Sequence, residues 1–222
     1  GLHTNAIYGF LNILFKILDE EEPSHLLVAF DEKAPTFRHK MYEEYKGKRK
    51  PMPAELSEQV PVIRNLLQVM NIRIYAEEGI EADDILGTMA KKAEQEGYLV
   101  SIVSGDRDLL QLATDTILVR IPKTSRGKTV VEDYHTAQVI EKYSVTPSQI
   151  IDLKGLMGDA SDNIPGVKGV GEKTALTLLK KYKSLEGVYE HLPEIKGALK
   201  EKLVNDKENA FFSKELATIY KD

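Results

Sequence analysis

Cysteine is absent from the 222 residues, and this absence removes whole classes of chemistry. The chain can form no disulfide, no thiolate metal site and no cysteine nucleophile. Any bound metal must therefore be held by oxygen or imidazole ligands, which favours hard cations such as Mg²⁺ or Mn²⁺. The sequence also lacks the Gly-x-Ser-x-Gly elbow of a serine hydrolase, so no side chain stands out as a covalent nucleophile.

Long apolar runs are also missing. No stretch approaches the roughly 20 consecutive apolar residues that span a bilayer. Residues 1–10 lack the basic region, apolar stretch and cleavage site of a signal peptide. We therefore expect a cytoplasmic protein with no membrane partner. Hydrophobic residues make up 42% of the chain, which is enough for the core of one or two globular domains.

Positive charge is scarce outside one segment of the chain. The net charge is −5, but residues 33–50 contain seven Lys/Arg and two Glu, so this segment carries +5 and the remaining residues carry −10. Such a division suits a protein that binds phosphates in one place and metals in another. A solvated basic loop beside ordinary acidic helices is the alternative explanation.

Apolar periodicity predicts alternating strands and helices in the first part of the chain. Short apolar runs typical of buried strands alternate with stretches of helical spacing. This alternation predicts an α/β fold with a mostly parallel sheet flanked by helices, in which ligands bind at the carboxyl ends of the strands. The expected helices cover residues 4–19, 54–70 and 82–97, and the expected strands cover 26–30, 72–76, 98–104 and 116–121.

Strand patterns stop at about residue 131, and short helices joined by Gly- and Pro-containing turns follow. We therefore predict two domains. Residues 1–131 form an α/β core that includes a basic excursion at 33–53, and residues 132–222 form a helical subdomain with a glycine-rich element at 166–174.

Acidic residues recur where turns would bring them together. They form four groups along the chain, and each of the first three groups follows a predicted strand. We therefore expect these three groups to share one edge of a parallel sheet. Two carboxylates about 4 Å apart repel by roughly 4 kcal/mol at an effective dielectric near 20, so their convergence requires cations. Paired cations held by oxygen ligands serve phosphoryl chemistry. Taken singly, each acid has an ordinary explanation as a strand end, helix cap or turn former. The acids are Asp31; Glu81, Asp83 and Asp84; Asp106 and Asp108; and Asp159 and Asp162.

Several motifs occur in register along essentially the whole chain: Val28–Asp31, Ala34–Arg38, Tyr45–Arg49, Glu81–Asp84, Gly105–Asp108 and Gly158–Gly166. Together they resemble the 5′ nuclease domain of bacterial DNA polymerase I. The resemblance implies a PIN-like 5′ nuclease fold with a helix-hairpin-helix-like element in the helical subdomain. It also implies a structure-specific nuclease that cuts phosphodiester bonds in flap or branched DNA and in RNA primers by two-metal hydrolysis.

The resemblance assigns a role to each acidic group, with Mg²⁺ or Mn²⁺ as two or more bound ions. Asp31, Glu81, Asp83, Asp84 and Asp106 would form or support an inner metal site. Asp108, Asp159 and Asp162 would form a second site. The groups expected to act on the scissile phosphate are Lys46, Asp31, Asp83 and Asp106.

The basic excursion would be a helical arch through which a free 5′ end passes. Tyr45 would stack on a base, and Arg38, Lys46 and Arg49 would contact phosphates, which suits binding without sequence preference. The alternative is a solvated loop whose tyrosines cover its underside.

The glycine-rich element is not a Walker A motif, because Glu172 separates the last glycine from the lysine. By resemblance it would hold duplex DNA and a potassium ion, with backbone N–H groups close to phosphates. The residues expected to bind DNA are Gly166, Lys168, Gly169, Gly171, Lys173 and Thr174. A tight turn before the next helix is the structural alternative.

The family begins with an apolar strand ending in Asp-Gly, whose aspartate binds metal, and nothing similar precedes residue 1. Because this metal-binding aspartate is missing, we expect impaired cleavage from this chain. The resemblance also implies a polymerase domain of the same polypeptide as a partner. Two alternatives are a non-catalytic fragment that binds branched DNA, and a ribonuclease or phosphatase with a similar acidic edge.

Overall fold

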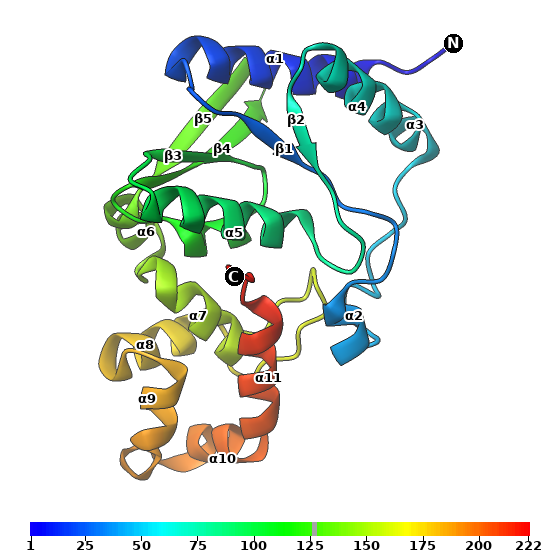
Figure 1. Cartoon of the computed structure of the whole chain (residues 1–222). Helices are drawn as coiled ribbons and strands as arrows, with labels where there is room; N and C mark the ends of the chain where they lie inside the picture. The colour runs from blue at the N-terminus through cyan, green and yellow to red at the C-terminus, as the bar shows by residue number, and fades with distance from the viewer. Residues whose placement is uncertain (126–127) are drawn as a thin grey trace.

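The computed structural model describes residues 1–125 and 128–222 and has an α/β part above a helical part (Figure 1). The first part contains α1 (Asn5–Glu21), β1 (Leu27–Ala29), α2 (Phe37–Met41), α3 (Ala54–Ser57), α4 (Gln59–Val69), β2 (Arg73–Tyr75), α5 (Ala82–Gln95), β3 (Val100–Val103), η1 (Arg107–Leu112), β4 (Ile117–Ser125) and β5 (Lys128–Tyr134). The second contains α6 (Thr136–Tyr143), η2 (Pro147–Gln149), α7 (Ile150–Met157), α8 (Glu172–Tyr182), α9 (Leu185–Glu190), η3 (Leu192–Glu194), α10 (Gly197–Asn205) and α11 (Lys207–Ala217).

The strands form two separately hydrogen-bonded sheets. β1 and β2 pair in parallel, with Val28 opposite Ile74. β3 and β4 also pair in parallel, with Ile102 opposite Val119, whereas β4 and β5 are antiparallel. Helix α5 contacts both β1 and β3, so one helix covers both sheets. The predicted α/β architecture with mostly parallel pairing and a helical C-terminal part is confirmed.

Strand β5 was not expected from the sequence, and the predicted domain boundary after residue 131 falls inside it. The strand alternates exposed and half-buried side chains along most of its length, and Val130 is largely exposed. It is therefore the outer arm of a hairpin with β4 and lacks the continuous apolar run of a buried strand.

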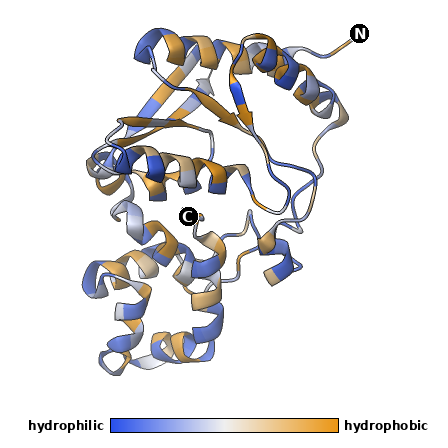
Figure 2. Cartoon of the chain, in the orientation of Figure 1, coloured by the Kyte–Doolittle hydropathy of each residue, from blue (hydrophilic) through white to orange (hydrophobic). Residues whose placement is uncertain are grey.

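Three groups of buried side chains hold the chain together. The largest runs from β3 and β4 through the helical part, and a second packs α1 and α4 around Ile7 and Leu67. The third joins Tyr45, Ile164 and Leu216, which come from three distant parts of the sequence. Hydrophobic and hydrophilic residues alternate around the helices in Figure 2, as expected where one face of a helix packs on a core. No helix in the described part of the chain is long and apolar enough to cross a membrane.

Candidate active site

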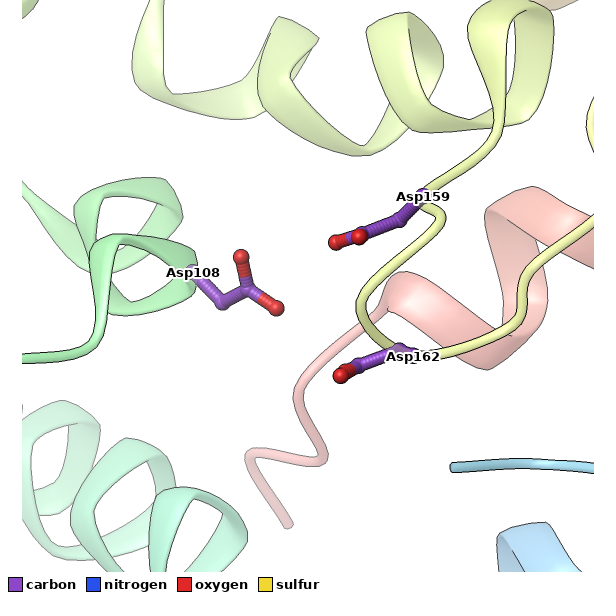
Figure 3. A group of neighbouring side chains, drawn as sticks. All are labelled: Asp108, Asp159 and Asp162. Carbon is purple, nitrogen blue, oxygen red and sulfur yellow. The ribbon is translucent and has the colours of Figure 1, made fainter. Parts of the chain in front are cut away.

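Three aspartates converge between η1 and the turn that follows α7 (Figure 3). Asp108, Asp159 and Asp162, here called the acidic triad, each offer a carboxylate oxygen, and these oxygens all lie within 4.8 Å of one another. Oxygen ligands at this separation suit a hard divalent cation. The donor set therefore fits the metal that the sequence analysis expects, and these three residues are the ones that the resemblance assigns to the second metal site.

Local hydrogen bonds shape the turn that carries two of these acids. The backbones of Asp159 and Ile164 exchange hydrogen bonds of 2.9 and 2.8 Å. The Asp159 carboxylate accepts hydrogen bonds from the Ser161 N–H, at 2.8 Å, and the Ser161 hydroxyl, at 2.6 Å. Gly158 and Gly166 both have positive φ at the base of the turn, which favours glycine. The turn thus presents both acids toward η1.

Lys154 of α7 donates hydrogen bonds to Asp108 and Asp159. Burial tends to raise the pKa of Asp159, but hydrogen bonds from Lys154 and Ser161 lower it to about 2. Burial also raises the pKa of Asp108, against the opposing effect of Lys154. Sequence analysis missed this lysine. Its only signal was its place on the preceding helix, five residues before Asp159.

The other predicted metal ligands surround the first turn of α5. The Asp31 carboxylate follows β1 and accepts a hydrogen bond from the Ala82 N–H at 2.8 Å. Burial, together with the negative charges of Asp106, Glu81 and Asp31, raises the pKa of Asp83 to about 7. These acids therefore interact electrostatically. They do not all share the edge of one sheet as predicted, because Asp106 follows β3, which belongs to a different sheet from β1 and β2. Asp106 is also tied to the backbone, since its carboxylate accepts a hydrogen bond from the Asp108 N–H at 2.9 Å.

Asp84 is engaged by other groups. Its carboxylate accepts hydrogen bonds from the Arg38 guanidinium, at 2.8 Å to each oxygen, and from the Glu81 and Tyr220 N–H groups. The side chain of Asp84 is 1% exposed. In this arrangement both carboxylate oxygens of Asp84 accept hydrogen bonds from protein groups, so Asp84 orients its neighbours and offers no free oxygen to a cation.

Arg38 differs from its expected position as well. It was predicted to contact phosphates, but it is buried with 2% of its surface exposed. Its partners are Glu81, Asp84 and the carbonyls of Leu216 and Thr218. The guanidinium is therefore unavailable to a phosphate in this structure, because protein groups use its hydrogen-bonding capacity.

The remaining arch residues lie over the acids and do not project away from the protein. Tyr45 is buried, and its hydroxyl donates a hydrogen bond to Glu81 at 3.2 Å, so its ring is not free to stack on a base here. Lys46 forms an ion pair with Glu81, and Arg49 forms one with Asp162. The backbone N–H of Lys46 donates to the Asp162 carbonyl at 2.9 Å. Residues 42–49 thus close over the acidic turn.

One small pocket collects residues from all these segments. It brings members of the two predicted metal sites together with the basic segment and the end of α11. It is lined by Arg38, Tyr45, Lys46, Glu81, Asp83, Asp108, Asp162, Ile164, Leu216, Ala217 and Ile219.

The glycine-rich element divides into a buried and an exposed half. Gly166 is buried, and its N–H donates to the Ser213 hydroxyl at 2.8 Å, so it serves the fold. The Lys168 N–H donates to Asp206, and the Gly169 carbonyl accepts from Lys202.

Beyond Gly169 the element turns into α8, whose first residues are exposed. Gly171 precedes the helix, and the Lys173 side chain lies in its exposed first turn beside the half-buried Thr174. This helix N-terminus keeps its N–H groups available, because no side chain caps it.

The structure therefore brings the acidic triad together, and it makes no second group of the same kind among the residues that it describes. Among residues 1–125 and 128–222, the acidic triad is the one group of three or more potential ligands within mutual reach. The inner acids interact through their charges, and two of them are held by Arg38.

Comparisons with known proteins give the same picture of the whole chain. The family profile described as "5'-3' exonuclease, N-terminal resolvase-like domain" matches residues 1–144, and "5'-3' exonuclease, C-terminal SAM fold" matches residues 145–222. DNA polymerase I of Bacillus subtilis (strain 168) is 57% identical over 100% of this chain and 25% of the relative. DNA polymerase I of Caldicellulosiruptor bescii is 48% identical over 100% of this chain and 26% of the relative. The chain thus spans about a quarter of the length of the curated relatives it matches.

Two solved structures share the fold. T5 5′-exonuclease with bound divalent zinc has a TM-score of 0.80 and 23% identity, over 95% of this chain and 80% of that one. The catalytic core of Rad2 in complex with DNA substrate has a TM-score of 0.61 and 17% identity, over 97% of this chain and 70% of that one. The predicted 5′ nuclease fold is confirmed.

Proposed function

The chain belongs to the 5′-3′ exonuclease family, and from that premise we propose that it is a metal-dependent nuclease that cuts 5′ flaps or branches in DNA and removes RNA primers. The observation that carries this proposal is one pocket that joins Asp108 and Asp162 of the acidic triad to Glu81 and Asp83, with Tyr45 and Lys46 of the basic segment also in its lining. A phosphodiester at this pocket would meet carboxylates that bind cations and, beside them, Lys46, which pairs with Glu81.

We propose that the acidic triad holds one divalent ion and that Asp31, Glu81, Asp83 and Asp106 hold or support another. Bound Mg²⁺ or Mn²⁺ would activate water and stabilise the leaving oxygen. The protein's own contribution is positional. Ser161 orients the Asp159 carboxylate, and the Ala82 N–H orients that of Asp31. Asp84 does not face the cation but holds Arg38 and the Glu81 backbone in place. Burial and then the neighbouring negative charges raise the pKa of Asp83, and a bound cation would favour its ionised form.

The ion pairs of the basic segment, residues 33–50, suggest how it could bind both acids and DNA. Lys46 forms an ion pair with Glu81, and Arg49 forms one with Asp162, so both carboxylates have a protein counter-charge. We propose that divalent ions take over the carboxylates when they bind, so that the two cationic side chains can turn to DNA phosphates. The segment would then act as the predicted arch, with Tyr45 stacking on a base once it leaves Glu81.

DNA outside the reacting strand would rest on the exposed half of the glycine-rich element. Lys173 and the uncapped N-terminus of α8 offer a positive charge and free N–H groups. The curated relatives are DNA polymerases I, so we propose a polymerase domain as the natural partner. A potassium ion at this element also stays a proposal.

Cleavage of a duplex with a labelled 5′ flap in Mn²⁺ tests the function. We expect cleavage near the branch, which the double substitution Asp108→Asn with Asp162→Asn should reduce by several orders of magnitude. Two controls test the metal requirement: EDTA removes the divalent ion, and Ca²⁺ replaces Mn²⁺ with a larger ion that also takes oxygen ligands. Folding of the variant is checked by circular dichroism. Cleavage of RNA or phosphomonoesters without cleavage of flap DNA would instead indicate the ribonuclease or phosphatase alternative.

The second candidate is a non-catalytic module that binds branched DNA. It is favoured by the finding that the inner acids, unlike the acidic triad, do not meet as a ligand group in the described part of the chain. Tight binding of flap DNA without any cutting in Mn²⁺ would establish this alternative and overturn the nuclease proposal.

A further inference from the structure

The end of the chain lies directly against the acidic end of α5. Figure 1 shows the C-terminus between α5 and α11. The Ile219 N–H donates to the Gln111 side-chain oxygen, and the Gln111 amide donates to the Ala217 carbonyl, both at 2.9 Å. The Tyr220 N–H donates to Asp84 at 2.9 Å. Residues 216–220, here called the C-terminal segment, are therefore docked by specific hydrogen bonds.

Arg38 connects this segment to the acids. Its Nε donates to the Leu216 carbonyl at 2.9 Å, and one terminal nitrogen donates to the Thr218 carbonyl at 2.7 Å. The remaining hydrogen bonds go to Asp84, at 2.8 Å each, and to Glu81, at 2.5 Å. A guanidinium has five N–H groups, and every one of them is used, so Arg38 has no spare donor.

The fit between the segment and α5 is close. A Cβ atom built on Gly87 of α5 would lie 2.6 Å from Ile219 Cγ2 and 2.8 Å from the Tyr220 carbonyl oxygen. Real contacts of this kind are longer, so only glycine at this position lets the segment approach α5. The three nearest atoms all belong to residues 219–221 and none to a carboxylate.

The segment also forms part of the pocket wall. Leu216, Ala217 and Ile219 line the same pocket as Glu81 and Asp83. Arg38 thus donates hydrogen bonds both to the acids Glu81 and Asp84 and to backbone carbonyls of the C-terminal segment.

We propose that Arg38 is a positioning residue that fixes Glu81 for divalent-cation binding only while the C-terminal segment is docked, so that the segment is an integral part of the metal site. The inference deepens the proposed function and rests on it. Losing the two carbonyl partners would leave a buried cation with unpaired donors. The guanidinium would then change its orientation to reach other acceptors. The carboxylates of Glu81 and Asp84, which it holds by hydrogen bonds, would move with it.

Three variants separate this role from general stabilisation. Arg38→Gln removes the charge, and Arg38→Lys keeps the charge but loses the planar fork. Gly87→Ala pushes the segment away from α5 without touching a carboxylate. Hydrogen exchange at the Ile219 and Tyr220 amides reports docking, and electron paramagnetic resonance of free Mn²⁺ reports metal affinity. Neither measurement involves DNA or cleavage.

Two controls match these changes. Gly9→Ala adds the same methyl group inside α1, where nothing lies within 4 Å. Ile63→Val removes a methyl group from the packing of α1 on α4, so it lowers stability away from the acids. Both controls should keep wild-type Mn²⁺ affinity and wild-type exchange at residues 219 and 220.

We expect Arg38→Gln and Gly87→Ala to speed exchange at both amides and to weaken Mn²⁺ binding by about 10-fold to 100-fold, the range for partners of metal ligands. Arg38→Lys should be intermediate. The inference is overturned if folded Arg38→Gln binds Mn²⁺ like wild type, or if Gly87→Ala frees the segment while affinity stays unchanged. Should Gly87→Ala leave exchange unaltered, Gln111→Ala replaces it in the same comparison, because it removes both side-chain hydrogen bonds to the segment. Wild-type protein that binds no Mn²⁺ would contradict the proposed function itself.

Discussion

The Nζ atom of Lys154 lies 2.7 Å from a carboxylate oxygen of Asp159, and the same ammonium group also pairs with Asp108. A cation that belongs to the chain therefore sits among the acids proposed to bind a divalent ion. Its charge offsets part of the repulsion within the acidic triad. It also competes with any metal for the same oxygens. The two effects can be separated experimentally.

Replacing Lys154 with Met should destabilise the metal-free protein and strengthen its Mn²⁺ binding. Without the ammonium group, Asp108 and Asp159 lose their counter-charge, while Asp162 keeps its ion pair with Arg49. We expect this loss to cost about 1–3 kcal/mol of unfolding free energy for these partly exposed groups. Mn²⁺ should recover more stability in the variant than in wild type, because no lysine has to be displaced. Melting temperatures in EDTA and in Mn²⁺ measure both effects.

Lys214→Met is the matched control for this experiment. Lys214 is also a poorly exposed lysine that pairs with two acids, Asp152 and Glu186, outside the acidic triad. Its loss should lower stability equally in EDTA and in Mn²⁺. A Lys154 variant that behaves in the same way would show that the lysine does not compete with the metal.

Asp83 should make metal binding depend on pH. Its pKa of about 7 in the folded chain lies above the ordinary 3.8. A carboxyl whose pKa is raised on folding contributes stability that is fully present below pH 3.8 and is lost as pH rises through 7. The melting temperature without metal should therefore fall over this interval, while Mn²⁺ affinity should rise because the cation needs the ionised form.

Asp83→Asn provides the comparison for the pH experiment. It cannot ionise, so the metal-free variant should be more stable than wild type at pH 8 by up to a few kcal/mol, at about 1.4 kcal/mol per pKa unit. Its Mn²⁺ affinity should be weak and nearly independent of pH between 5.5 and 8.5. A steep pH dependence that survives in the variant would assign the titration to another group.

The basic segment was recognised from its charge, but its contacts were not. A run of seven Lys/Arg among residues 33–50 predicted phosphate binding. The structure instead buries Arg38 and pairs Lys46 and Arg49 with acids. Local sequence cannot reveal such pairings, because Lys46 and Glu81 lie 35 residues apart and meet only in the folded chain. The neighbouring Tyr45 packs in one buried cluster with Ile164 and Leu216, which are also far away in the sequence.

For the acidic residues, in contrast, the sequence predicted their approximate location but not their individual roles. Their positions after predicted strands were enough to expect them at one sheet edge, and Asp31 and Asp83 do interact there. Which acids would face a cation and which would serve as structural partners did not follow from spacing. Asp83 and Asp84 are adjacent, yet Asp84 is enclosed by Arg38 and the backbone of Tyr220. That difference depends on the C-terminal segment, far away in the sequence.

Lys46→Ala and Arg49→Ala should each reduce the salt dependence of flap-DNA binding. If both side chains leave their acidic partners for phosphates, each loss lowers the slope of log affinity against log salt by roughly 0.7–0.9. The slope is the useful quantity, because removing Arg49 also leaves the buried Asp162 without its ion pair and can change affinity for that reason. Fluorescence anisotropy over a range of KCl concentrations in Ca²⁺ gives the slopes.

Lys16→Ala serves as the control for the salt experiment. Lys16 lies on α1 and pairs with Glu20 on the same helix, away from the acidic residues. Its slope should equal that of wild type. Wild-type slopes in both Lys46→Ala and Arg49→Ala would mean that the basic segment stays on the acids when DNA binds.

Gly166→Ala should damage the acidic turn, whereas Gly171→Ala should not. A Cβ on Gly166 would lie 2.2 Å from the Gly158 nitrogen, and φ at this residue is +60°. The strained backbone alone costs about 1–3 kcal/mol, and relief of the clash requires residues 158 and 166 to separate. Because Asp159 and Asp162 lie between them, Mn²⁺ affinity should fall together with the melting temperature. Gly171 has ordinary φ and nothing within 4 Å of a built Cβ, so Gly171→Ala should keep both values. Calorimetric melting with and without Mn²⁺ compares the two variants. If Gly166→Ala lowered stability while leaving Mn²⁺ affinity intact, the turn would not be what positions Asp159 and Asp162 for a cation.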